Sequence, residues 1–144
     1  MKKLFPIFII ILLFHSCSDK YRKVSNDKFI GTWELQGASI LTGIHVKITK
    51  EDGGLKGRIV KLNENKYVTL FADSADTWIS GIERSSNFSF IITENKLGKP
   101  LFGLYGLPTS QQYKAEFIND NTIGLAIDSS DPKRSSRVYV RINN

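Results

Sequence analysis

Cysteine is nearly absent from this chain, since Cys17 is the only one among 144 residues. A single thiol cannot form an internal disulfide, so a folded domain here must depend on the burial of apolar side chains. Histidine is scarce too, with only His15 and His45 present. Because the sequence has no cluster of His and Cys residues that could hold zinc, we expect neither a bound metal nor a cofactor.

A hydrophobic run long enough to cross a membrane is also lacking. The marked apolar run covers residues 4–14, about half of the roughly 20 residues that a membrane-spanning helix needs. Lys2 and Lys3 precede this run, and Ser16 and Cys17 follow it. A basic start, a short apolar centre and a small residue at the end are typical of an export signal that is later removed. We therefore predict a signal peptide over residues 1–16.

The end of this segment resembles a known processing site. Ser16 directly before Cys17 resembles the lipobox of bacterial lipoproteins, and the bulkier Phe14 and His15 are similar to lipoproteins of the Bacteroidota group. In that family the cysteine is acylated, for example with palmitate, and becomes the first residue of the mature protein. The resemblance implies lipidation of Cys17 and a lipid-anchored place in the cell envelope, most simply at the outer membrane. The alternative is an ordinary secreted protein with a free thiol.

A strong charge excess is missing from the rest of the chain. Without residues 1–16, 128 residues remain, with 18 basic and 14 acidic side chains. This length suits one domain with its own core. The mild basic excess is spread along the chain, so we do not expect nucleic-acid binding. The polar segment 17–28 carries four basic residues and predicts a linker, either a solvated tether or a segment lying against acidic lipid head groups.

Residues 29–144 show the pattern of an all-β domain. Short β-rich runs alternate with turn residues every eight to twelve positions, and no window keeps a helical period. A single antiparallel up-and-down β-barrel of eight to ten strands would leave no exposed strand edge, although a two-sheet sandwich would show the same pattern. We expect strands near 30–40, 44–50, 55–63, 66–72, 77–84, 87–93, 101–106, 111–118, 122–127 and 136–142.

Alternation within these runs predicts which side chains face inward. Ile44, Val46 and Ile48 share one face of their strand, as expected when one side of an antiparallel sheet is buried. In the last strand the apolar set at 138, 140 and 142 lies opposite Arg137 and Tyr139. If the apolar set faces inward, Arg137 and Tyr139 face water. Only a polar, water-filled lumen would reverse that assignment.

The first and last strands resemble a known superfamily. Gly31-x-Trp33 on the opening strand is similar to lipocalins and fatty-acid-binding proteins, and Arg137-x-Tyr139 on the closing strand is similar to the latter. The resemblance implies a calycin-type barrel with Trp33 at its closed end and with Arg137 and Tyr139 holding a ligand carboxylate. Fatty-acid-binding proteins carry a helical lid between their first two strands, and only residues 41–43 separate them here.

Three features are candidates for binding. Arg137 offers a planar, permanently charged fork for a carboxylate or phosphate, and Tyr139 adds a phenol donor. Trp78 either lines a cavity or belongs to the core. The stretch 100–108 is apolar on both faces, which predicts either a strand buried on both sides or a contact surface.

Residues arranged for catalysis are not evident. His45 lies on a polar strand face beside Lys47, and Asp73 and Asp76 fall in an expected turn. We therefore expect no enzyme. The leading hypothesis is a non-enzymatic envelope lipoprotein that binds a small amphiphilic or acidic ligand in or at the mouth of the barrel. The alternative is a protein-interaction lipoprotein, an inhibitor or accessory subunit of an envelope complex, with a barrel filled by side chains.

Overall fold

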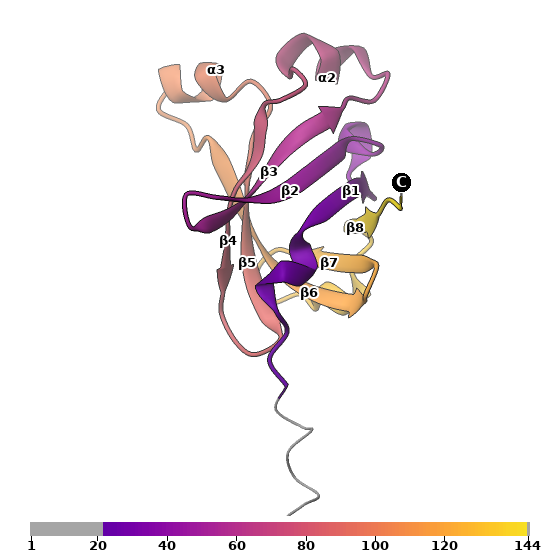
Figure 1. Ribbon diagram of the computed structural model, residues 1–144. Helices are drawn as coiled ribbons and strands as arrows, with labels where there is room; N and C mark the ends of the chain where they lie inside the picture. The colour runs from indigo at the N-terminus through magenta and orange to yellow at the C-terminus, as the bar shows by residue number, and fades with distance from the viewer. Residues whose placement is uncertain (1–21, 144) are drawn as a thin grey trace, which may run out of the picture.

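The computed structural model describes residues 22–143 and shows a closed barrel of eight antiparallel strands (Figure 1). Each strand pairs with the next along the chain, and the last pairs with the first. This confirms the all-β prediction and the up-and-down barrel, and it excludes the sandwich. The strands are β1 (Gly31–Gln36), β2 (His45–Glu51), β3 (Gly54–Lys61), β4 (Thr77–Arg84), β5 (Ser89–Asn95), β6 (Ser110–Asn119), β7 (Thr122–Ala126) and β8 (Val138–Arg141).

Closure of the barrel depends on the pairing of β1 with β8. Trp33 lies opposite Arg141 in this register, and Gln36 lies opposite Val138. Because β8 also pairs with β7, each strand has a partner on both sides. A barrel closed in this way leaves no strand edge free for pairing with another chain.

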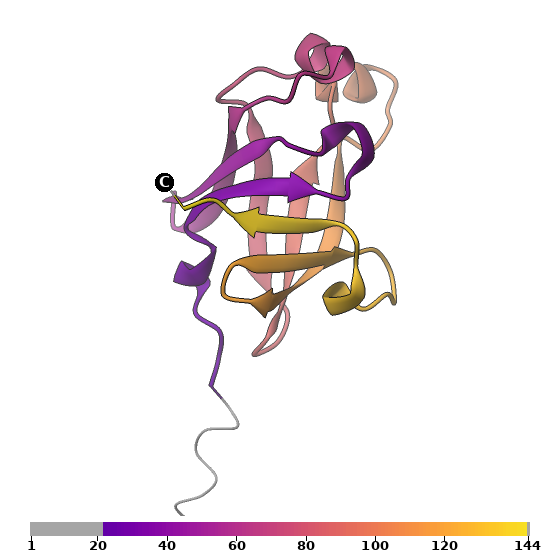
Figure 2. The same cartoon turned by 90° about the vertical axis from the view of Figure 1, so that its right-hand side faces the viewer.

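The two ends of the barrel differ in character (Figures 1 and 2). One end, which we call the helical end, carries α2 (Lys66–Phe71), α3 (Lys99–Leu104) and the 3₁₀ turn Ser39–Leu41. At the opposite end lie the β4–β5 turn and the 3₁₀ turn Asn26–Phe29. There the Val24 N–H donates to the Asn87 carbonyl at 3.0 Å, so the start of the described chain is fixed away from the helical end.

Two of the ten expected strands are wrong, because residues 66–71 and 99–104 are helical. The Asn65 side chain accepts a hydrogen bond from the Tyr67 N–H at 2.9 Å and so caps the start of α2. Pro100 lies in the first turn of α3, where its missing N–H costs nothing. A helix of six residues is too short to show a helical period, so β-rich composition misled the prediction.

The lumen is filled by one continuous apolar cluster. Ile44, Val46 and Ile48 are fully buried in it, as alternation predicted. Trp33 is fully buried near the end opposite the helices, which confirms its expected place. Its indole N–H donates to the Phe29 carbonyl at 2.7 Å, and the Arg141 guanidinium lies 4.1 Å from the ring centroid.

No helix within residues 22–143 is long and apolar enough to cross a membrane. Since the barrel closes on itself and its core consists of its own side chains, the segment 22–144 can be produced and studied as an independent domain.

Candidate functional site

Arg137, which directly precedes β8, and Tyr139 on β8 both face inward, so the valines of β8 do not. Tyr139 is fully buried, and the Arg137 side chain is only 17% exposed. Val138 and Val140 are half-buried on the outer surface. The reason is a carboxylate inside the barrel: Glu94 gives the arginine and the phenol a buried partner. Arg137 and Tyr139 therefore face inward through this buried contact, in a lumen that is otherwise filled by apolar side chains.

Glu94, at the helical end of β5, is the centre of this site and is only 3% exposed. The Arg137 Nη2 donates to Glu94 Oε2 at 2.5 Å, and the Tyr139 hydroxyl donates to Oε1 at 2.6 Å. The Trp78 indole N–H in turn donates to the Tyr139 oxygen at 2.8 Å. Side chains from β4, β5 and the start of β8 thus meet in one network, and all three ligand candidates belong to it.

Burial dominates the protonation behaviour of this network. It raises the pKa of Glu94 above its usual value of 4.5, and the positive charge of Arg137 with the bonds from Tyr139 opposes only part of that effect. Burial also raises the pKa of Tyr139 well above its usual value of 10.0, and the neighbouring Glu94 raises it further. The phenol therefore remains a hydrogen-bond donor at neutral pH.

Arg137 has one donor that no residue in 22–143 satisfies. Its guanidinium lies 4.7 Å from the Tyr113 ring centroid and pairs with Glu94 through Nη2. Its Nε is buried and has no hydrogen-bond partner within the described chain. A buried donor without an acceptor costs about 1–3 kcal/mol. An acceptor that reached this atom would therefore bind favourably.

A cavity of about 430 Å³, which we call the mouth pocket, opens at the helical end directly over this network. Glu94 and Arg137 contribute to its wall, and most of the remaining lining is apolar. The apolar side chains come from the 3₁₀ turn, β4, the β5–α3 connection, α3 and β6: Ile40, Leu41, Trp78, Leu97, Phe102 and Tyr113.

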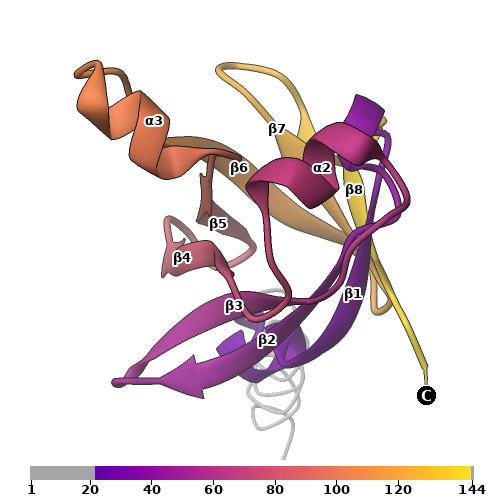
Figure 3. The ribbon, with the colours of Figure 1, turned by 90° about the horizontal axis from the view of Figure 1, so that it is seen from above.

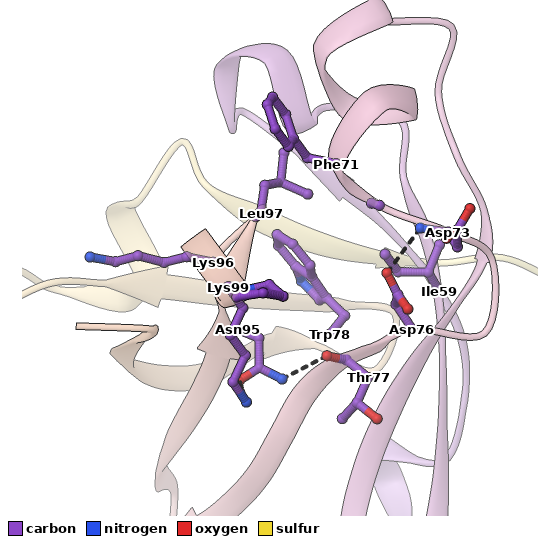
Figure 4. Close-up of a pocket in the computed structure, with 13 residues that line it drawn as sticks. Ile59, Phe71, Asp73, Asp76, Thr77, Trp78, Asn95, Lys96, Leu97 and Lys99 are labelled. Carbon is purple, nitrogen blue, oxygen red and sulfur yellow. Dashed lines mark hydrogen bonds between the residues drawn. The ribbon is translucent and has the colours of Figure 1, made fainter. Parts of the chain in front are cut away.

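A second cavity of about 450 Å³, the side pocket, lies next to it and shares Trp78 and Leu97 with the mouth pocket. In Figure 4 the Trp78 ring stands in the middle, with Lys96 and Lys99 on one side. Asp73 and Asp76 lie on the other side. The side pocket therefore has one cationic and one anionic wall.

Sequence reasoning missed Glu94, because the expected strand 87–93 ended one residue before it, whereas β5 extends to Asn95. The signal was its position, because Glu94 falls on the same face of the strand as Phe90 and Ile92, both fully buried. A carboxylate that continues an inward series of apolar residues requires a buried cation. Arg137 is that cation.

The other candidates lie apart from this site. Cys17 falls outside the described residues, so its lipidation remains a prediction. His45 lies 3.5 Å from Glu34 at the barrel surface. The Asp73 N–H donates to Asp76 Oδ2 at 2.9 Å, the local turn contact expected of that pair. Residues 22–143 contain no group of three His, Cys, Asp or Glu side chains placed to hold a metal ion.

Comparisons with protein-family models, with curated proteins and with solved structures give no match to this chain. The observed eight-stranded antiparallel barrel is compatible with a calycin-like fold.

Proposed function

We propose that this protein is a non-enzymatic binding module of the cell envelope that holds a small amphiphilic ligand in the mouth pocket. The observation that carries the proposal is the combination of apolar walls with Arg137 in the pocket lining, whose buried Nε has no hydrogen-bond partner within the described chain. Ligand pockets typically pair apolar walls with a few placed polar groups that fix orientation.

The polar end of the ligand should carry a hydrogen-bond acceptor. Glu94 already balances the charge of Arg137 through Nη2, and Lys96 adds a further positive charge to the lining, so the pocket offers both a hydrogen-bond donor and a cation. A carboxylate or a neutral oxygen could both accept from Nε. The apolar part of the ligand would lie against Ile40, Leu97 and Phe102.

Titration of the isolated domain with decanoate and with decanol tests this proposal. Calorimetry should show binding of both, because each probe carries an oxygen that can accept a hydrogen bond from Nε, and decanoate should bind more tightly because Lys96 also lines the pocket. Ile40→Arg should weaken binding at least tenfold, since it fills the pocket mouth without touching the Glu94 network. Phe88→Arg is the matched control, because Phe88 is 47% exposed against 45% for Ile40 and lies at the opposite end of the barrel. No heat with either probe, or equal loss in both variants, would contradict a ligand site here.

A protein-interaction function is the second candidate, and a specific observation favours it. The apolar stretch 100–108 is not a buried strand, because Leu101, Leu104 and Tyr105 are 50%, 77% and 76% exposed. The lumen is also filled by side chains rather than by a large internal cavity. Exposed apolar surface of this kind is typical of contact sites.

A further inference from the structure

The helical end exposes an apolar face on each of its two helices. Tyr67, Leu70 and Phe71 on α2 are 55%, 71% and 45% exposed. They occupy positions i, i+3 and i+4, which form one face of a helix. Leu101 and Leu104 on α3 and Tyr105 directly after it repeat the same spacing. These six large apolar side chains on and next to two short helices make up what we call the apolar end.

Neither of these apolar faces packs against the core of the barrel. Val68 is the only buried residue of α2, and α3 has none. Figure 3 shows α2 above the barrel and α3 reaching outward beyond the strands. A helix normally buries its apolar face against another element. The apolar end therefore has the composition of an interface that the single chain leaves uncovered.

The two connections that carry these helices have opposite charge. Residues 62–76, which contain α2, hold three carboxylates and one lysine, a net charge of −2. Residues 96–109, which contain α3, hold Lys96 and Lys99 and no carboxylate, a net charge of +2. Figure 4 shows this division at the side pocket, with Lys96 and Lys99 on one side of Trp78 and Asp73 and Asp76 on the other.

A surface that is positive on one side, negative on the other and apolar between is complementary to a copy of itself. When two such surfaces meet about a two-fold axis lying in the interface, perpendicular to the direction from the positive to the negative side, each positive side faces the partner's negative side. Charge arranged in this way also fixes the register of an interface. A lipid surface carrying charge of one sign would match only one of the two connections.

We propose that two copies of this chain associate head to head through the apolar end, with α2 of each copy against α3 of the other. The proposal does not rest on ligand binding in the mouth pocket. It predicts that Asp73 lies near Lys99 of the opposing copy.

Sedimentation of the domain 22–144 across micromolar concentrations tests for the dimer. Leu104→Asp places a charge in the centre of the interface and should raise the dimer dissociation constant at least tenfold. Phe88→Asp, an equally drastic change at the opposite end, should leave it unchanged. A chain that stays monomeric at about 1 mM, or a dimer that Leu104→Asp does not weaken, would overturn the proposal.

A charge exchange tests the orientation. Lys99→Glu alone and Asp73→Lys alone each bring like charges together, and each should weaken the dimer several-fold at low salt. The double variant Lys99→Glu with Asp73→Lys keeps the net charge and restores opposite charges, so its dissociation constant should return to within about threefold of the original. Additive weakening in the double variant would overturn the two-fold arrangement.

Two further readouts separate this proposal from others. In flotation with vesicles of phosphatidylglycerol and phosphatidylethanolamine, the native domain should bind no better than the Leu104→Asp variant. Binding that depends on Leu104 is the contrary result. Such binding would assign the apolar end to a lipid surface instead. Decanoate titration of Leu104→Asp should still show the mouth-pocket affinity, so loss of the dimer and failure of the ligand site can be told apart.

Discussion

At the scale of single residues, the buried ion pair between Glu94 and Arg137 is the feature that most constrains this barrel. Its two residues lie 43 positions apart in the chain, and Tyr139 and Trp78 extend the network. Buried ion pairs add little net stability, but removal of one partner leaves an uncompensated charge in the interior. Mutations here should therefore behave in a strongly non-additive way.

The first prediction is a double-mutant cycle on that pair. Glu94→Met and Arg137→Met should each lower the free energy of unfolding by about 3–5 kcal/mol, because each leaves one buried charge alone. The double variant should lose much less than the sum, since two apolar side chains can replace the pair. Urea denaturation of the four proteins measures this. Losses that simply add would mean that the two charges are not coupled.

The second prediction concerns pH. Because burial raises the pKa of Glu94 above 4.5, the folded state holds this proton more tightly than the unfolded state. The resulting stabilisation is complete below pH 4.5 and is lost as the pH rises through the folded pKa. The stability difference between the native protein and Glu94→Gln should therefore shrink, or change sign in favour of Glu94→Gln, as the pH rises from 4 to 8. A difference independent of pH in that range would contradict the raised pKa.

The inward placement of Arg137 could not have been obtained from its strand alone. Alternation separates Val138 and Val140 from Arg137 and Tyr139, but it does not say which set faces the lumen. The answer depends on Glu94, which lies on β5, a strand that does not pair with β8. Glu94 and Arg137 come together only when the barrel has formed. Reading Glu94 as a member of the inward series would have supplied it.

At the scale of elements, the eight strands were predictable because their apolar residues alternate. Ile44, Val46 and Ile48 behave as the pattern requires. The two helices were not, since Lys66–Phe71 and Lys99–Leu104 are rich in β-forming or glycine residues and one and a half turns long. Their local signals, the Asn65 cap and Pro100 in the first turn, were present in the sequence.

The third prediction contrasts two strand glycines that both have ordinary backbone angles. A Cβ added at Gly124 in β7 would lie 1.8 Å from the Pro132 carbonyl oxygen, which is rigid backbone. At Gly81 in β4 an added Cβ meets nothing within 4 Å. Gly124→Ala should lower the free energy of unfolding by about 1–3 kcal/mol or more, while Gly81→Ala should be neutral or stabilising by up to about 1 kcal/mol. Thermal denaturation compares the two, and equal effects would contradict the close approach at Pro132.

At the scale of the whole molecule, the barrel places the start of the described chain at one end and the proposed binding surfaces at the other. The described chain begins at the end that holds the β4–β5 turn, while the mouth pocket and the apolar end lie at the other (Figures 1 and 2). An anchor placed before residue 22 would therefore leave the helical end free to meet a ligand or a second copy. This arrangement is consistent with both proposals.

The fourth prediction tests that anchor. Since Cys17 follows an export-length apolar run, we expect cleavage before it, acylation of Cys17 and retention in the envelope. Cells fed radiolabelled palmitate should label the native chain, and Cys17→Ala should abolish both the label and the sedimentation of the protein with membranes. The apolar end supplies the needed control, because Leu104→Asp should leave label and membrane association intact if the lipid alone anchors the protein. Membrane association that survives Cys17→Ala but not Leu104→Asp would move the attachment from the lipid to α3, and would reverse the orientation of the barrel at the membrane.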